Sequence, residues 1–168
     1  MLCEFTSDSG QIQHLDYCYT PTQFCEMLTA WRSDTLCFAS FTTYLGREKV
    51  FDELRALFPH AALSQIENRD SIITSPPEKI LLVGTPFRLE VWRALLDVER
   101  GTTITYSQLA AHTSHPTAVR TVATSVGRNP ICVIVPCHRV LPATGGIGNY
   151  HSGAEIKRLL LEAEGALP

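Results

Sequence analysis

From Thr105 to Val126 the chain reads TYSQLAAHTSHPTAVRTVATSV. Thr105 and Gln108 have the spacing of a capping box, which predicts that a short helix begins at Tyr106. A tight turn of three residues follows, and Pro116 is a suitable first residue for a second helix. A short helix, a tight turn and a second helix form a helix-turn-helix pattern, so we expect one here.

The second of these helices has two different faces. Its expected inward face is an apolar stripe at helical spacing, made of Val119, Val122, Ala123 and Val126. Its expected outward face carries small side chains, namely Thr117, Ala118, Thr121, Thr124 and Ser125. Arg120 is the one long side chain on that face. Small residues let a helix approach a nucleic-acid backbone, and hydroxyls can donate to phosphates. An ordinary solvated face is the alternative, but such a face normally carries Glu and Lys.

A cysteine beside a histidine follows this pattern, in the segment Pro136–Leu141 (PCHRVL). The apolar run 131–135 before it, closed by a proline at each side, predicts a strand that aims Cys137 from a rigid base. Only the thiolate is a good nucleophile, and His138 or Arg139 could favour it by taking the proton or adding positive charge. A small core side chain is the other interpretation of a cysteine, and we assign it to Cys3, Cys18, Cys25, Cys37 and Cys132.

The rest of the chain predicts a mixed α/β protein with two domains. Strands are expected at 12–19, 26–31 and 36–41, a helix at 46–58, and a linker over the polar residues 61–79. A helix is then expected at 86–98. We therefore predict an N-terminal mixed α/β structural domain, an antiparallel sheet with a helix, which occupies 1–80 with its linker, and a mostly helical domain at 81–168.

Composition limits the classes of function. The chain has 168 residues, 45% of them hydrophobic and 18% charged, which suits one compact domain or two small ones. No membrane span or signal peptide is present, so we expect a cytoplasmic protein with reduced thiols and no cofactor. Because there is no Cys-x-x-Cys unit we also expect no bound metal, with a structural zinc at Cys3, His14, Cys18 and Cys25 as the alternative. Residues 1–83 carry 6 basic and 11 acidic side chains, a balance of −5, whereas 84–168 carry 8 and 6, a balance of +2. Any phosphate-binding surface should therefore lie on the second half.

Several segments of the second half resemble one family, the O6-alkylguanine-DNA alkyltransferases, also called methylated-DNA–protein-cysteine methyltransferases. The resemblance extends without gaps from about residue 84 to residue 165. It is carried by Asn129-Pro130, Pro136–Val140, Gly148-Asn149-Tyr150, Thr85-Pro86-Phe87, Val91–Leu95, Thr105–Ala110, Ala118–Val122 and Leu160–Gly165. It implies a ribonuclease H-like first domain, and a winged-helix-like helix-turn-helix in the second, which would bind DNA and accept the alkyl group.

The resemblance also implies roles for individual residues. Cys137 would accept the alkyl group, His138 would take its proton through a water molecule, and Glu164 would orient the imidazole. Asn129 would hold the turn that carries the cysteine. From the residues alone, Glu164 is better interpreted as a surface carboxylate, and Asn129 has the alternative of a helix C-cap.

Further residues would contact the substrate. The base pocket would be lined by Tyr106, Val140, Tyr150 and His151, with Tyr106 donating a proton to the departing guanine. The DNA-binding residues would be Arg120, Thr117, Ala118, Thr121 and Thr124, with Arg120 filling the gap left by a flipped base.

The implied function is DNA repair by a monomer. The protein would flip O6-alkylguanine, and also O4-alkylthymine, out of double-stranded DNA and transfer the alkyl group irreversibly to Cys137. A non-catalytic lesion-binding protein is the alternative, but such relatives lack the acceptor cysteine. A Cys-His hydrolase would not need the small-faced helix. A transcription regulator would need more base-reading side chains on that helix.

Overall fold

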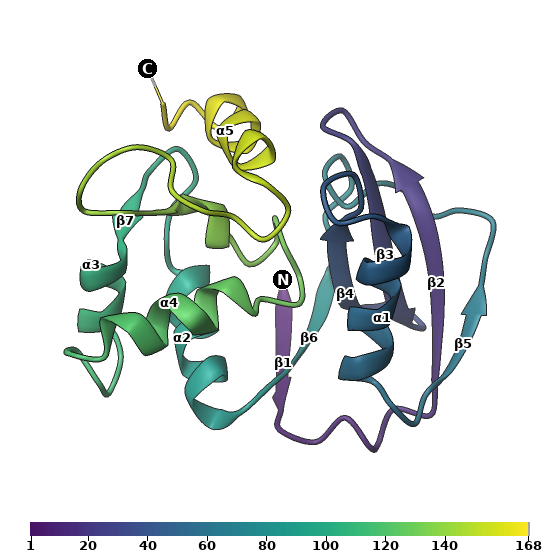
Figure 1. Cartoon of the computed structure of the whole chain (residues 1–168). Helices are drawn as coiled ribbons and strands as arrows, with labels where there is room; N and C mark the ends of the chain where they lie inside the picture. The colour runs from purple at the N-terminus through teal and green to yellow at the C-terminus, as the bar shows by residue number, and fades with distance from the viewer. Residues whose placement is uncertain (168) are drawn as a thin grey trace. The chain divides into compact units, whose positions relative to one another are not determined.

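In the computed structural model, which describes residues 1–167, backbone contacts divide the chain into two units, Met1–Thr85 and Pro86–Pro168. Both α-helices and β-strands are present, so the prediction of a mixed α/β protein is confirmed (Figure 1). No helix in the described part of the chain is long and apolar enough to cross a membrane.

The first unit is a six-stranded sheet with one helix against it (Figure 1). Its elements are β1 (Leu2–Thr6), β2 (His14–Pro21), β3 (Glu26–Arg32), β4 (Thr35–Phe41), α1 (Arg47–Leu57), β5 (Ala62–Gln65) and β6 (Lys79–Val83). The strand order is β1-β6-β4-β3-β2-β5, in which β2, β3 and β4 are antiparallel neighbours and the remaining pairs are parallel. The prediction of an antiparallel sheet holds for these three strands and is wrong for β1, β5 and β6, because strands joined by long connections can pair in parallel. Val50, Leu54 and Phe58 pack from the helix side into the core with sheet residues such as Leu28 and Leu81.

The sequence pattern identified the local pairs of this sheet and missed the distant ones. The strands predicted at 12–19, 26–31 and 36–41 and the helix at 46–58 are confirmed as β2, β3, β4 and α1, within two residues at each boundary. The linker predicted at 61–79 is wrong in part, because it contains β5. That strand is polar and mostly exposed, and it is held by parallel pairing with β2 rather than by an apolar pattern. The edge strand β1 pairs with β6, from the other end of the unit, and had no local signal.

The second unit consists of short elements around a helical core. These are α2 (Pro86–Leu96), β7 (Ile104–Thr105), α3 (Tyr106–Ala111), α4 (Val119–Gly127), a 3₁₀ turn (Cys137–Arg139), β8 (Val140–Leu141) and α5 (Ala154–Ala163). The capping box of α3 is confirmed, because the Thr105 hydroxyl accepts from the Gln108 backbone while the Gln108 side chain accepts from the Thr105 backbone. β7 and β8 pair in parallel, and this brings the start of α3 beside the exit of the Cys-His motif.

Helix α4 begins three residues later than predicted. The Ala118 N–H donates to the His115 carbonyl at 3.0 Å and closes a turn in which Pro116 takes the second position. The fixed φ of proline suits that position of a turn as well as it suits a first helical residue. Thr117 and Ala118 therefore lie before the helix rather than on it.

The segment 131–135 is a tight turn, so the prediction of a strand there is wrong. The Val135 N–H donates back to the Ile131 carbonyl at 3.0 Å, and Val133 adopts a positive φ of 73°. The two flanking prolines have no N–H to offer a neighbouring strand, and the Ile131 N–H and the Val135 carbonyl are bonded to the Asn129 side chain.

Trp92 joins α2 to α4 at the centre of this unit. Its indole is buried, and Nε1 donates to the Ser125 carbonyl at 2.8 Å. Ser125 is itself buried and its hydroxyl donates to the Thr121 carbonyl, so placing it on the outward face was wrong. Val122 and Val126 are buried as the stripe predicted.

We expect Trp92→Phe to destabilise the second unit. The change removes a buried N–H and leaves the Ser125 carbonyl with one partner fewer, so the free energy of unfolding should fall by roughly 1–3 kcal/mol. Urea unfolding followed by far-ultraviolet circular dichroism measures this. Tyr44→Phe, at an exposed aromatic side chain, is the control. A loss at Trp92 no larger than that of the control would contradict the assigned role.

Candidate active site

Cys137 opens the 3₁₀ turn Cys137–Arg139 and is buried, with 6% of its surface exposed. Its backbone N–H donates to the Val135 carbonyl at 2.8 Å, so the end of the preceding turn fixes the cysteine directly. A hydrogen-bonded turn, and not the predicted strand, therefore positions the sulfur.

The side chain of Asn129 holds this turn together. Its Oδ1 accepts from the Ile131 N–H at 3.1 Å, and its Nδ2 donates to the Val135 carbonyl at 2.8 Å and to Cys137 Sγ at 3.1 Å. One amide thus satisfies both ends of the turn and contacts the sulfur. An amide that donates to sulfur stabilises a thiolate, so Asn129 serves both the backbone and the thiol.

His138 follows the cysteine and is completely buried. Its Nε2 lies 3.1 Å from Glu164 Oε1, and Glu164 ends helix α5. Because a carboxylate only accepts hydrogen bonds, this contact assigns the proton of the neutral ring to Nε2. Nδ1 is buried and has no hydrogen-bond partner among residues 1–167, which leaves its lone pair available to accept a proton.

The sequence suggested that Arg139 could favour the thiolate by placing positive charge beside it, but the structure directs Arg139 elsewhere. Its guanidinium is directed to Glu164, with Nε 2.8 Å from Oε2 and Nη2 2.8 Å from Oε1. Burial alone would raise the pKa of Glu164, but the hydrogen bonds from His138 and Arg139 outweigh it and lower the pKa to about 2. The carboxylate is therefore ionised throughout the physiological range.

The thiol is protonated at rest. Burial raises the pKa of Cys137, and the hydrogen bonds with Asn129 and Tyr150 together with the charge of Lys157 offset this only in part. The thiol donates to the Tyr150 hydroxyl, with a Sγ–O distance of 3.8 Å. Burial also lowers the pKa of His138, and the carboxylate of Glu164 only partly compensates. The site thus pairs a neutral thiol with a neutral imidazole.

Lys157 is a functional candidate that the sequence analysis missed. It is 1% exposed, and its ammonium donates to the Val140 carbonyl at 2.7 Å. Burial lowers its pKa to about 8. Lys157 follows buried Ile156 on α5, and a lysine in an amphipathic helix is usually exposed. The hydrophobic pattern of the sequence therefore did not indicate that this lysine is buried.

The structure brings some of the predicted pocket residues together and leaves others apart. Tyr106 starts α3, where burial and the nearby Cys137 raise the pKa of its phenol. Tyr150 contacts the thiol directly, and burial raises its pKa well above the ordinary value. Both backbone groups of Val140 are already bonded within the protein, the N–H to Cys137 and the carbonyl to Lys157. His151 is exposed on a turn.

The residues predicted to contact DNA are on the surface of one segment. Arg120, Thr121 and Thr124 are exposed on α4, and Thr117 is exposed in the turn before it. Ala118 is partly exposed at the N-cap. The Thr124 hydroxyl donates to the Arg120 carbonyl at 3.0 Å, so its own proton is already used within the helix.

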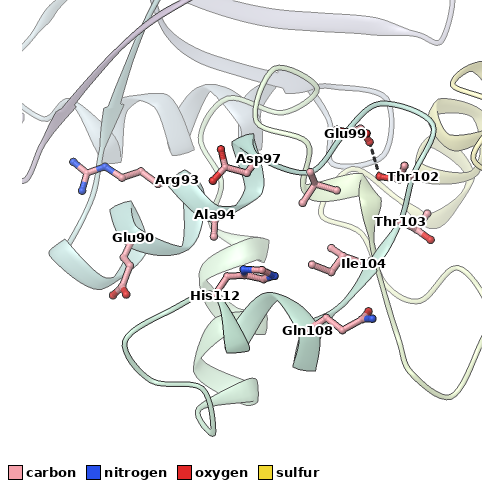
Figure 2. A pocket seen from close by; sticks show the side chains of 11 residues that line it. Glu90, Arg93, Ala94, Asp97, Glu99, Thr102, Thr103, Ile104, Gln108 and His112 are labelled. Carbon is pink, nitrogen blue, oxygen red and sulfur yellow. Dashed lines mark hydrogen bonds between the residues drawn. The ribbon is translucent and has the colours of Figure 1, made fainter.

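A cavity of about 620 Å³ lies elsewhere in the second unit, on α2 and α3. Figure 2 shows Glu90, Asp97, His112 and Gln108 around it. None of the predicted site residues lines this cavity, so it is separate from the candidate site. Among residues 1–167, no three His, Cys, Asp or Glu side chains are gathered in a way that could hold a metal ion.

Comparison with known proteins identifies relatives of this chain. Residues 86–166 match the family model described as "6-O-methylguanine DNA methyltransferase, DNA binding domain". An inducible methylated-DNA–protein-cysteine methyltransferase of Bacillus subtilis is 35% identical over 132 residues, which cover 70% of this chain and 72% of that protein. A methylated-DNA–protein-cysteine methyltransferase of Methanosarcina acetivorans is 44% identical over 88 residues, or 52% of this chain and 56% of that protein.

Solved structures match over a larger part of the chain. The crystal structure of Mycobacterium tuberculosis OGT in complex with DNA has a TM-score of 0.67 and 29% identity, and the match covers 89% of this chain and 92% of that one. The O6-methylguanine-DNA methyltransferase from Pyrococcus kodakaraensis has a TM-score of 0.66 and 27% identity, covering 90% and 99%. The structural likeness therefore includes the first unit, which lies outside the segments that carry the sequence resemblance.

We expect the stability cost of burying Lys157 to depend on pH. Because its pKa falls from 10.5 in the unfolded chain to about 8 in the folded one, the unfolded chain binds more protons between these values. The wild type should therefore gain stability relative to Lys157→Met as the pH rises from 8 to 10.5. Urea unfolding at several pH values measures this, and Lys49→Met on the exposed side of α1 controls for the loss of a lysine. A difference between wild type and Lys157→Met that stays constant over this range would contradict the assignment.

Proposed function

The chain belongs to the 6-O-methylguanine DNA methyltransferase family, and on that basis we propose that it transfers an alkyl group from O6-alkylguanine in DNA irreversibly to its own Cys137. Its enzyme class is that of the methylated-DNA–protein-cysteine methyltransferases, and it acts in DNA repair. The observation that carries the proposed chemistry is a buried thiol followed directly in the chain by a buried imidazole that contacts an ionised Glu164.

The first step would produce the thiolate. The proton would leave Cys137 Sγ and reach His138 Nδ1 through one water molecule, because Nε2 already donates to Glu164. The resulting imidazolium would lie against the carboxylate, which stabilises its charge. The amide of Asn129 would donate to the sulfur as negative charge develops there.

The thiolate would then attack the alkyl carbon. A carbon–sulfur bond would form as the bond from that carbon to O6 breaks, and the electron pair would pass to the guanine. Tyr106 would donate a proton to the leaving base, and its raised pKa keeps the phenol protonated at neutral pH. The product on the protein would be a thioether, which water does not cleave, so each molecule would react once.

The depth of Cys137 explains why the base would have to leave the duplex. The sulfur is almost fully covered, and a base stacked inside DNA could not reach it. Arg120 is exposed at the start of α4, where its long side chain could enter the stack and take the place of the flipped base. The small exposed residues of α4 and the preceding turn would let the helix approach the backbone of the DNA.

The remaining parts of the proposal concern organisation. The second unit would be the DNA-binding and alkyl-acceptor domain, with α3 and α4 as a winged-helix-like helix-turn-helix. The first unit would be a ribonuclease H-like structural domain. We propose a monomer that also accepts O4-alkylthymine. A non-catalytic lesion binder would need no nucleophile. The hydrogen bond from Asn129 to Cys137 and the contact between His138 and Glu164 therefore favour alkyl transfer over binding alone.

Mixing the protein with a duplex that contains O6-methylguanine should increase the mass of the peptide carrying Cys137 by one CH₂ unit. Mass spectrometry after proteolysis measures this, with protein in excess and in deficit. Cys137→Ala should abolish transfer and keep lesion binding, whereas Cys132→Ala, at a buried cysteine five positions earlier, should still react. More than one methyl group removed per protein molecule would contradict the single-turnover scheme.

Arg120→Ala should reduce repair of duplex DNA far more than reaction with free O6-benzylguanine, because only the duplex requires base flipping. The rates of both reactions under single-turnover conditions measure this. Arg120→Lys keeps the positive charge and separates loss of charge from loss of the guanidinium. Equal losses on the two substrates would argue against a role of Arg120 in extruding the base.

A further inference from the structure

Arg139 forms a three-point connection behind the proposed proton acceptor. Two of its N–H groups bind the two oxygens of Glu164, and Nη1 donates to the Val98 carbonyl at 2.5 Å. Arg139 and Glu164 are 12% and 11% exposed at their side chains. The planar guanidinium matches a carboxylate in this two-bond arrangement, and an ammonium could not reproduce it.

The carboxylate is shared between two partners. Glu164 Oε1 accepts both from His138 Nε2 at 3.1 Å and from Arg139 Nη2 at 2.8 Å. Arg139 is permanently charged, so it compensates part of the negative charge that the imidazole would otherwise feel alone. The strength of His138 as a base therefore depends on how the negative charge of Glu164 is shared between His138 and Arg139.

We propose that Arg139 is a positioning residue for alkyl transfer: it fixes Glu164 against His138 and takes up enough of its charge that the imidazole stays neutral until the thiol proton arrives. This inference rests on the proposed function, since a neutral imidazole matters only if it must accept a proton. Arg139 acts through Glu164, because its side-chain hydrogen bonds within residues 1–167 go to Glu164 and to the Val98 carbonyl.

The charges around His138 support this division of roles. Burial lowers the pKa of His138, Glu164 on α5 raises it, and the charges of Arg139 on the same turn and Lys157 on α5 lower it. Without Arg139, Glu164 would interact with the imidazole alone. The balance would then move toward the protonated ring, which cannot accept a proton.

The loop after α2 holds the same carboxylate residue from the backbone side. Val98 opens this loop, and Gly101 within it has a φ of 79°. A Cβ at Gly101 would lie 3.1 Å from the Glu164 carbonyl, so the absence of a side chain permits the close approach. Thr102 closes the loop by donating to the Glu99 carbonyl, as Figure 2 shows at the wall of the cavity. Arg139 thus connects the Glu164 carboxylate to this loop.

Arg158 lies on α5, the helix that ends at Glu164, and provides a matched control. It forms ion pairs with Glu155 and Glu162, so it has the same chemistry as Arg139. Its side chain is 40% exposed, and within residues 1–167 its hydrogen bonds go to Glu155 and Glu162 rather than to His138 or Glu164. Removing it tests the loss of an arginine ion pair without a change at the imidazole.

The test compares Arg139→Met, Arg139→Lys and Arg158→Met with the wild type in two measurements. The first is the titration of the His138 imidazole by ¹⁵N NMR, which needs no substrate. Its midpoint should move to higher pH in Arg139→Met, move less in Arg139→Lys, and stay unchanged in Arg158→Met. No movement in either Arg139 variant, or movement to lower pH, would overturn the proposal.

The second measurement is the single-turnover rate of methyl transfer from O6-methylguanine duplex as a function of pH. At pH 7 the rate of Arg139→Met should fall at least about tenfold, a part of the ~10²–10⁴ that a positioned general base contributes. The loss should shrink as the pH rises, because the imidazole then loses its extra proton. A loss by the same factor at every pH would indicate a purely structural role and overturn the proposal. Absence of transfer by the wild type would instead refute the proposed function and leave the NMR result standing.

Discussion

The three hydrogen bonds of the Asn129 amide are the interaction on which the site depends. A turn that contains Val133 at a positive φ is unfavourable for a β-branched residue, and its backbone groups cannot be left unpaired inside the protein. The amide satisfies the Ile131 N–H and the Val135 carbonyl at once, and the remaining donor contact is to Cys137 Sγ. The same side chain that makes the turn possible therefore sets the environment of the sulfur, so backbone geometry and thiol chemistry are not separable here.

Burial opposes ionisation of both reactive groups at this site, the thiol of Cys137 and the imidazole of His138. A covered thiol is harder to ionise and a covered imidazole is harder to protonate, so the two neighbours are neutral together at rest. The charged groups are kept one step away, at Glu164, Arg139 and Lys157. These groups are ionised and hydrogen-bonded before a substrate arrives. They can therefore stabilise the charges that develop when the proton leaves the thiol, with little reorganisation of solvent during the reaction.

Sequence reasoning succeeded where neighbouring residues decide the structure. The capping box at Thr105 and Gln108 and the helix before Pro59 rest on contacts within one turn, and both are present. It failed where one residue suits two structures. Pro116 fits a helix start and a turn equally well, and the apolar run 131–135 fits a strand and a buried turn. In both places the choice was made by partners outside the window that the pattern describes.

The sequence by itself determined the family, through the Cys-His motif and the ungapped set of segments around it, and it determined which residue types are available for chemistry. Only the tertiary structure decided which atoms meet. His138 and Glu164 are 26 residues apart, and Arg139 joins Glu164 to Val98, which lies 41 residues before it in the chain. Such contacts depend on how α2 and α5 pack on the turn at Cys137, and packing follows from shape and burial summed over the whole unit, which no local spacing contains.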